Sequence, residues 1–282
     1  MAKIDWRGGE NDGGGAIILV RENDGGGGRI AGSYPFTPGE LPGWDKSFGG
    51  EGLPVVHPTI ADAVFPDDGW DPAIVIDDIA LRFAGMACWK SDTFPEPPPE
   101  QSAVDPEKKF KDDLDAFIVA RAALDNKVKD EIRYQVDDII TYFMKLSACS
   151  PDVRPKTYFL LVLSLRIASI VVRHYKRKFM RARPAQVMPW VDTVIPTPRH
   201  PAYPSGHAMQ AYLMAHAMKV VAPQLETMAM SLADRIALNR VLAGVHFPAD
   251  GEASRSVIGI VWDCLQTVDG ITELVTAAKL EH

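Results

Sequence analysis

The sequence predicts an all-α protein, in which one or two helical bundles follow a loop-rich N-terminal segment. Three observations carry this prediction. Fifteen of the 22 glycines lie before residue 53, and glycine-rich and proline-rich stretches favour turns over packed elements. From Asp105 onward, apolar residues recur at spacings of three and four, which is typical of amphipathic helices. Strand-like alternation is hard to find in that part of the chain.

The first element in chain order is a glycine- and proline-rich N-terminal wrap, residues 1–104. Its string END-GGG occurs twice, at 10–15 and 22–27. Glycine turns around a short hairpin or linker explain this repeat. A phosphate-binding glycine loop is the alternative, but the GK[ST] ending and a following helix signal are missing. The helical domain spans 105–279, and residues 280–282 resemble the start of a purification tag.

Apolar periodicity predicts the helices of the second domain. They are expected at 110–122, 127–146, 157–182, 207–221, 225–243 and 253–267. The helix at 157–182 is the most apolar and is expected to be central and buried. Its apolar run from Tyr158 to Val172 contains Arg166 and is shorter than the ~20 residues that span a bilayer. With no signal-peptide core at the N-terminus, we expect a soluble protein without a membrane partner.

Charge and cysteine content exclude several classes of protein. The chain carries 37 acidic and 30 basic residues, a net charge of −7, which argues against a nucleic-acid partner because such proteins need positive charge. The cysteines Cys88, Cys149 and Cys264 are far apart and form no CxxC pair. This spacing excludes a zinc ribbon and makes a disulfide scaffold unexpected, so a reduced cytoplasmic location fits best.

Two clusters carry residues suited to binding an anion. In the first, Lys176 and Arg183 are seven residues apart, close to two helical turns, and Pro184 is expected to end the helix. Taken alone, such a basic run is typical of a solvated helix end. In the second, Ser205 and Gly206 precede an apolar helix. Ser205 is either a simple N-cap or part of an anion site at the helix N-terminus.

The third cluster joins Arg240, His246 and Asp250. A helix break at Gly244 would allow Arg240 and His246 to reach one site. Asp250, four residues after His246, is placed to accept the imidazole N–H and fix its tautomer. On its own, a histidine at the end of a helix is more often structural than catalytic, so the interpretation depends on the three clusters together.

In this order the clusters resemble the signature of the type 2 phosphatidic acid phosphatase and vanadium-dependent haloperoxidase superfamily. That signature reads K-x6-RP, then PSGH, then SR-x5-H-x3-D, and the resemblance covers residues 105–270. Asn239 stands where the family has serine. The resemblance implies helical bundles of the vanadium haloperoxidase and acid phosphatase type, built as two related four-helix sets. Homodimerisation is implied by the resemblance alone.

The resemblance also implies roles for these residues around a tetrahedral oxyanion, which is vanadate as a cofactor or phosphate as a substrate. His246 would bond to the central atom, as the vanadium ligand or as the nucleophile toward phosphorus, and His207 would be the acid–base. Asp250 would orient His246. The oxyanion ligands would be Lys176, Arg183, Ser205, Gly206 and Arg240.

Two chemistries fit this set of residues. His200 precedes His207 by seven residues and resembles a second histidine of vanadium bromoperoxidases, unless it is only a loop residue. We therefore expect a haloperoxidase that uses hydrogen peroxide and bromide or iodide. The alternative is a soluble acid phosphatase that hydrolyses small phosphomonoesters through a phosphohistidine. A non-catalytic phosphate-binding protein is the third option, through the basic residues Arg173, Lys176, Arg177, Lys178, Arg181 and Arg183.

Overall fold

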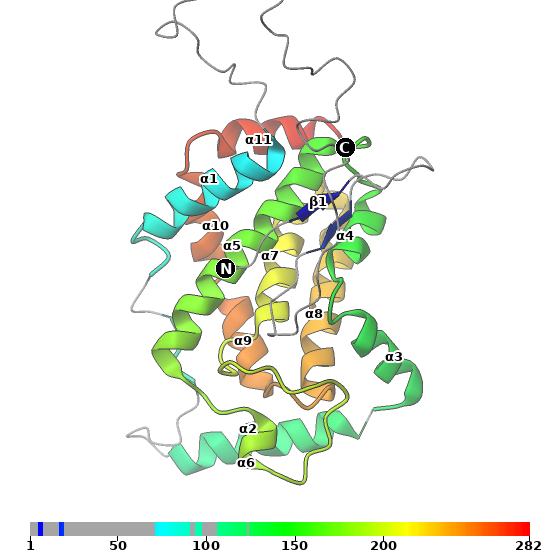
Figure 1. Ribbon diagram of the computed structural model, residues 1–282, viewed down its shortest axis with the longest axis vertical. Coiled ribbons are helices and arrows are strands. Elements are labelled where there is room, and N and C mark those ends of the chain that lie inside the picture. Colours follow the sequence, from blue (N-terminus) through cyan, green and yellow to red (C-terminus); the bar gives the residue numbers. More distant parts are fainter. Residues whose placement is uncertain (1–4, 8–16, 20–70, 91–93, 98–105, 123) are drawn as a thin grey trace, which may run out of the picture. The chain divides into compact units, whose positions relative to one another are not determined.

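The computed structural model describes residues 5–7, 17–19, 71–90, 94–97, 106–122 and 124–282. The regular secondary structure of these residues is helical apart from one short antiparallel ladder, so the predicted all-α class is confirmed (Figure 1). The helices are α1 (Pro72–Gly85), α2 (Pro106–Arg121), α3 (Asn126–Tyr134), α4 (Ile140–Ser147), α5 (Pro155–Phe179), α6 (Pro184–Val187), α7 (Gly206–Val221), η3 (Pro223–Leu225), α8 (Glu226–Leu242), α9 (Pro248–Ser256), α10 (Ile258–Gln266) and α11 (Ile271–Lys279).

The ladder pairs β1 (Asp5–Arg7) with β2 (Ile17–Leu19), with Trp6 opposite Ile18. Both glycine repeats, at 10–15 and 22–27, lie outside the described residues, as does most of the predicted wrap.

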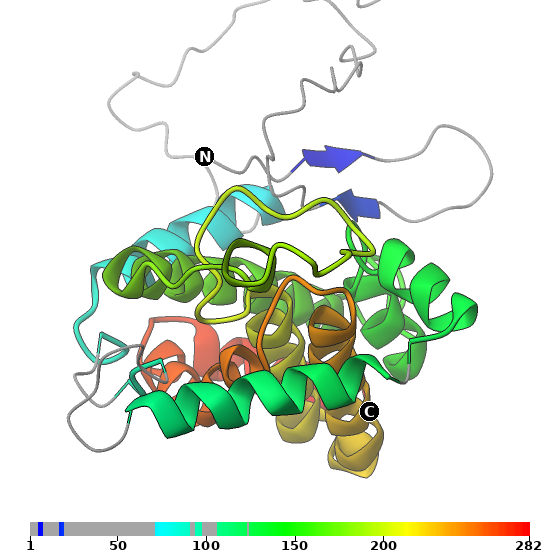
Figure 2. The same ribbon diagram turned by 90° about the horizontal axis from the view of Figure 1, so that it is seen from below.

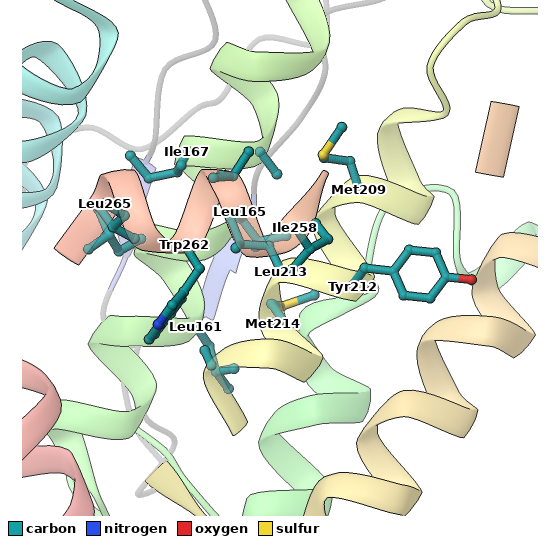
Figure 3. Close-up of a cluster of buried hydrophobic side chains, with 14 of the residues drawn as sticks. Leu161, Leu165, Ile167, Met209, Tyr212, Leu213, Met214, Ile258, Trp262 and Leu265 are labelled. Carbon is teal, nitrogen blue, oxygen red and sulfur yellow. The ribbon is translucent and has the colours of Figure 1, made fainter. Parts of the chain in front are cut away.

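Helices α5 and α7 form the centre of the helical unit. Both are buried along most of their length, and α7 packs between α5 and α8. Helices α1, α10 and α11 pack onto the same core. Its side chains come from distant parts of the chain (Figure 3), among them Leu161, Leu165, Ile167, Met209, Leu213, Met214, Ile258, Trp262 and Leu265.

The apolar character of α5 is explained by this central position. The stretch Pro155–Val187 is long and apolar enough to cross a membrane by length and composition, so the expectation that it is too short is wrong. However, 72% of its most apolar window is buried inside the protein, as expected for a core helix. The absence of a membrane partner stays a prediction.

Helix α1 is an element that the sequence analysis predicted as loop. Asp71 caps it by accepting a hydrogen bond from the Ala73 amide (2.8 Å), and Pro72 occupies the first turn, where its missing N–H costs nothing. Ile76 and Phe83 then reach the core. The glycine- and proline-rich flanks hid this periodicity. The domain boundaries themselves stay a prediction.

Two predicted helices are each divided in the structure. The segment 127–146 forms α3 and α4, because the Asp138 carboxylate accepts a hydrogen bond from the Thr141 amide (3.0 Å) and starts a new helix. The last predicted helix corresponds to α9 and α10, which meet at Val257. Helix α11 was not predicted.

A disulfide joins Cys88, just after α1, to Cys264 on α10, with a Cα–Cα distance of 5.7 Å. The sequence predicted only that a disulfide scaffold is unexpected, and this single bond was not predicted. Sequence spacing failed because the two cysteines are 176 residues apart and meet only through tertiary packing. Disulfides persist mainly in oxidising compartments, so this bond argues against a reduced cytoplasmic location. Cys149 is a free, buried thiol.

The final residues contact the beginning of α5. The Glu281 carboxylate accepts hydrogen bonds from the amides of Lys156 and Thr157, both at 2.8 Å. These amides belong to the first turn, whose donors have no partner within the helix. The interpretation of residues 280–282 as a tag stays a prediction.

Candidate active site

The three sequence clusters meet where several helices begin or end. Lys176 lies in the last turn of α5, Ser205 occupies the N-cap position of α7, and Arg240 lies at the end of α8. His246 lies just before α9, and α2 crosses α8 and α9 (Figure 2). The Ser205 amide donates to the Asp250 carbonyl at 2.9 Å, which ties the second cluster to the third.

His246 is held in one orientation by Asp250. Its Nδ1 lies 2.9 Å from Asp250 Oδ2, and the same carboxylate oxygen accepts the Phe247 amide at 3.0 Å. Because a carboxylate accepts, the proton belongs on Nδ1. The other ring nitrogen, Nε2, then presents a lone pair, and Arg183 Nη1 lies 3.1 Å from it.

The surroundings of His246 are strongly electropositive. Its pKa lies well below the ordinary value, first because the ring is buried, and then because of the positive charges of Arg183, Lys176, His207 and Arg240. His246 is therefore neutral at neutral pH, with its Nε2 lone pair directed at Arg183 Nη1. The same set of charges makes the site suited to an anion.

The buried neutral His246 gives a pH-dependent stability. Unfolded histidine titrates near pH 6.5, whereas the folded pKa is lower, so the unfolded state binds more protons below pH 6.5. Stability should therefore fall as pH drops from about 6.5 toward the folded pKa, by at most about 1.4 kcal/mol per pH unit. Urea unfolding at several pH values should show a shallower dependence for His246→Gln than for wild type. Equal slopes would contradict the assignment.

Arg183 does not lie on the helix of Lys176, contrary to the prediction that both share one helical face. Helix α5 ends at Phe179, because Met180 adopts a left-handed conformation (φ 52°). Arg183 is extended at the start of α6, where its guanidinium is fully buried. It donates to the Val245 carbonyl at 2.8 Å and to the His200 carbonyl at 3.0 Å.

His200 contacts the same guanidinium through its ring. Its Nδ1 accepts a hydrogen bond from Arg183 Nη2 at 2.9 Å. This contact gives His200 a place beside the site, as a residue that positions Arg183. A catalytic role for His200 stays a prediction.

Lys176 connects α5 to the loop before α7. Its ammonium group donates to the Pro201 carbonyl at 2.6 Å and the Ala202 carbonyl at 2.9 Å. The side chain is buried, so its charge lies inside the site rather than in solvent.

Buried donors without partners distinguish an anion site from ordinary helix capping. Ser205 occupies the N-cap of α7, but its hydroxyl makes no capping hydrogen bond. In the described part of the chain, Ser205 Oγ and Arg240 Nε and Nη1 are buried and have no hydrogen-bond partner. Each such group costs about 1–3 kcal/mol when left unsatisfied. An oxyanion would satisfy them.

Arg240 is positioned by α3 and by a break in the chain. Its Nη2 donates to the Ile132 carbonyl (3.2 Å) and to Gln135 Oε1 (3.3 Å). Burial lowers its pKa to about 10, so it stays positive at neutral pH. Gly244 has a φ of +81°, and a Cβ there would collide with the Arg121 guanidinium. The predicted break at Gly244 is thus present.

His207 lies in the first turn of α7, beside the connection between α3 and α4. Its Nε2 is 3.2 Å from the Val136 carbonyl oxygen. It is half-buried, unlike His246. His207 therefore lies at the more open side of the site, where a leaving group would depart.

Arg181 and Asp113 also contact the site, although no sequence pattern predicted this. Arg181 donates to Asp250 Oδ1 and to Asp113 Oδ2, both at 2.7 Å. Desolvation alone would lower the pKa of Arg181, but the two carboxylates outweigh it and the pKa is raised. Arg181 was visible only as one more basic residue, and Asp113 lies on α2 with no local signal.

The basic helix end is divided by burial. Lys176 and Arg183 point into the site, whereas Arg173, Arg177 and Lys178 are exposed. A docking surface for phosphate-bearing partners would not need the buried members. This arrangement supports a built site over simple electrostatic docking.

Residues 157–269 match the model of the PAP2 superfamily, and this stretch contains all three clusters. No curated protein matches the chain. Among solved structures, the chain is similar to a transmembrane PAP2-type phosphatidylglycerolphosphate phosphatase from Bacillus subtilis, at 16% identity. That alignment covers 72% of this chain and 96% of the other, with a TM-score of 0.42.

Proposed function

We propose that this protein is a phosphatase that hydrolyses phosphomonoesters through a phosphohistidine on His246. The observation that carries the proposal is the neutral His246, whose Nε2 carries a lone pair, close to buried donor atoms of Ser205 and Arg240 that have no hydrogen-bond partner in the described part of the chain. The match to the PAP2 superfamily supports it. The resemblance of the sequence clusters points to the same set of residues.

The phosphoryl group would bind first. Arg183, Arg240 and Lys176 supply positive charge, and the Ser205 hydroxyl and the Gly206 amide supply hydrogen bonds at the positive end of α7. Charge-assisted hydrogen bonds of this kind are stronger than neutral ones. They would hold phosphorus next to His246 Nε2, since Arg183 already lies 3.1 Å from that nitrogen.

The chemistry would then run in two steps. His246 Nε2 attacks phosphorus as the bond from phosphorus to the leaving oxygen breaks, and His207 gives its proton to that oxygen. The phosphohistidine remains. His207, now neutral, takes a proton from water, whose oxygen attacks phosphorus and breaks the P–N bond. Inorganic phosphate leaves, and both histidines return to their starting protonation.

In the sequence, His200 favoured the haloperoxidase. We nevertheless prefer the phosphatase. The bond from Arg183 to His200 Nδ1 gives this histidine a structural role without peroxide chemistry. Vanadate has the tetrahedral shape and charge of phosphate, so the same donors fit it, with His246 as the vanadium ligand. When bound, it would supply Lewis-acid activation of peroxide.

The test is phosphate release from p-nitrophenyl phosphate by the purified protein, with His246→Ala as the control. We expect the wild type to turn over the substrate and the variant to lose this activity. Wild type incubated with 32P-labelled substrate should carry a protein-bound label that survives an alkaline quench and is lost in acid. A parallel bromination assay with orthovanadate, peroxide and bromide distinguishes the other chemistry. Bromination without phosphate release would overturn the proposal.

A further inference from the structure

We propose that a hollow between α3 and α4 binds the leaving group, and that it selects aromatic phosphomonoesters whose ring carries a carboxylate. The hollow measures about 370 Å³ and is lined by Tyr134, Thr141, Tyr142 and Lys145. This inference rests on the proposed phosphatase activity and specifies its substrate class.

The segment between α3 and α4 has this hollow on one side and contacts residues of the oxyanion site. Arg240 contacts the end of α3 through Gln135 Oε1, and His207 lies 3.2 Å from the Val136 carbonyl oxygen. The Gln135 side chain also lies close to Tyr142, one of the residues that line the hollow. The short segment Gln135–Val136 therefore contacts Arg240, His207 and a residue that lines the hollow.

The position of His207 also places the leaving group near the hollow between α3 and α4. The leaving oxygen must face His207, because His207 is the proposed proton donor. His207 contacts the segment that leads into α4. The organic part of the substrate, which extends from that oxygen, would therefore lie toward α3 and α4 rather than toward the buried His246 and Asp250.

The lining residues indicate what would bind. The rings of Tyr134 and Tyr142 lie edge to face, with centroids 6.0 Å apart and planes at 84°. Tyr134 is 56% exposed, so its ring surface is open to contact by an aromatic group of the substrate. Aromatic rings pack favourably against one another. Lys145 adds a positive charge and Thr141 a hydroxyl.

Burial raises the pKa of Tyr142, and two nearby acidic groups, Glu131 and Asp138, help to raise it. A negative ring substituent would therefore be favoured only on the side of Lys145. Glu131 is paired with Arg235 at 2.7 Å, and the Asp138 carboxylate accepts the Thr141 amide. Lys145 is exposed and lines the hollow, where its positive charge would attract a carboxylate. The combination of two tyrosines and a lysine favours an aryl carboxylate over an alkyl chain.

The experiment compares three esters: 4-carboxyphenyl phosphate, the neutral 4-carbamoylphenyl phosphate, and ethyl phosphate. Because their intrinsic reactivities differ, each variant is compared with wild type on the same ester. Lys145→Met should lower kcat/KM for the carboxylate about fivefold and leave the carbamoyl ester within twofold. Tyr134→Ala should lower kcat/KM for both aryl esters about tenfold and leave kcat/KM for ethyl phosphate unchanged. Lys127→Met, on the exposed start of α3, should change nothing.

Each other outcome has a defined meaning. If the wild type hydrolyses the esters but neither variant changes the aryl-to-alkyl ratio, the hollow is not the leaving-group site and the phosphatase stands. If Lys145→Met affects the carbamoyl ester as much as the carboxylate, the charge selection is wrong. If the wild type hydrolyses none of the three, the phosphatase and the inference are both overturned.

Discussion

Replacing Asp250 by asparagine will lower kcat/KM for phosphomonoesters about 10³- to 10⁴-fold, with much less effect on phosphate binding. Asp250 Oδ2 fixes the proton of His246 on Nδ1. An amide in this position can present its NH₂ group to the ring, which favours the tautomer whose proton is on Nε2. The nucleophilic lone pair is then lost, although Arg183 and Arg240 remain.

The same substitution will also destabilise the fold. Asp250 is fully buried, and its other carboxylate oxygen is paired with Arg181 at 2.7 Å. Breaking one side of a buried ion pair typically costs about 3–5 kcal/mol. Urea unfolding measures this loss, and kcat/KM measured under native conditions, at low temperature, measures the catalytic effect separately.

Asp113→Asn is the matched control for Asp250→Asn. Asp113 is also paired with Arg181 at 2.7 Å, but it does not contact the imidazole. We expect it to lose stability while keeping kcat/KM within about tenfold of wild type, because catalytic losses of 10³ or more arise when the base or its orienting group is altered. If Asp250→Asn kept activity within tenfold, the tautomer argument would be wrong.

Replacing Arg240 by methionine will lower activity while raising the stability of the ligand-free protein. Arg240 is buried, with two nitrogens that have no partner in the described part of the chain. Burial disfavours the charged form of its guanidinium and lowers the pKa of Arg240 to about 10. An apolar side chain of similar length avoids this cost, and replacing buried charges by apolar groups can stabilise proteins by about 1–4 kcal/mol.

The loss of function follows from the same position. Without Arg240 the oxyanion loses a charge-assisted ligand, and truncating one partner of a buried charged contact commonly costs about 2–5 kcal/mol in binding. We expect kcat/KM to fall by about 10²- to 10³-fold. Inorganic phosphate should raise the Tm of wild type, because a ligand that binds only the folded state stabilises it. It should raise the Tm of the variant far less.

Arg235→Met, on the same helix, controls for the loss of a positive charge. Arg235 pairs with Glu131 near the surface, where such pairs contribute about 0–1 kcal/mol, so its loss should neither stabilise the protein nor impair activity. If Arg240→Met lowered the Tm in the absence of phosphate, Arg240 would be a structural residue instead of an oxyanion ligand.

Local sequence patterns predicted the parts of this protein that depend on neighbours in sequence. Apolar periodicity located α2, α5, α7 and α8, and the spacing of His246 and Asp250 predicted their contact. The helix-face argument for Lys176 and Arg183 failed, because it assumed that the helix continues past Met180. One left-handed residue ends α5 and turns the chain back toward the site.

Contacts between distant segments could not be predicted in this way. Asp113 reaches Arg181 from α2, and Gln135 reaches Arg240 from the end of α3. Neither residue belongs to a recognisable pattern. The pairing of Cys88 with Cys264 depends on the packing of α10 against the centre of the fold, and a count of three cysteines gives no indication of it.

That disulfide closes a covalent ring that contains every residue of the proposed site, from Lys176 to Asp250. A protease that cuts the chain once between Cys88 and Cys264 therefore leaves one molecule, not two. The pieces of a nicked enzyme stay attached and can keep their positions in the bundle. They should separate on a denaturing gel only after reduction, so one cut would be invisible in a non-reduced sample.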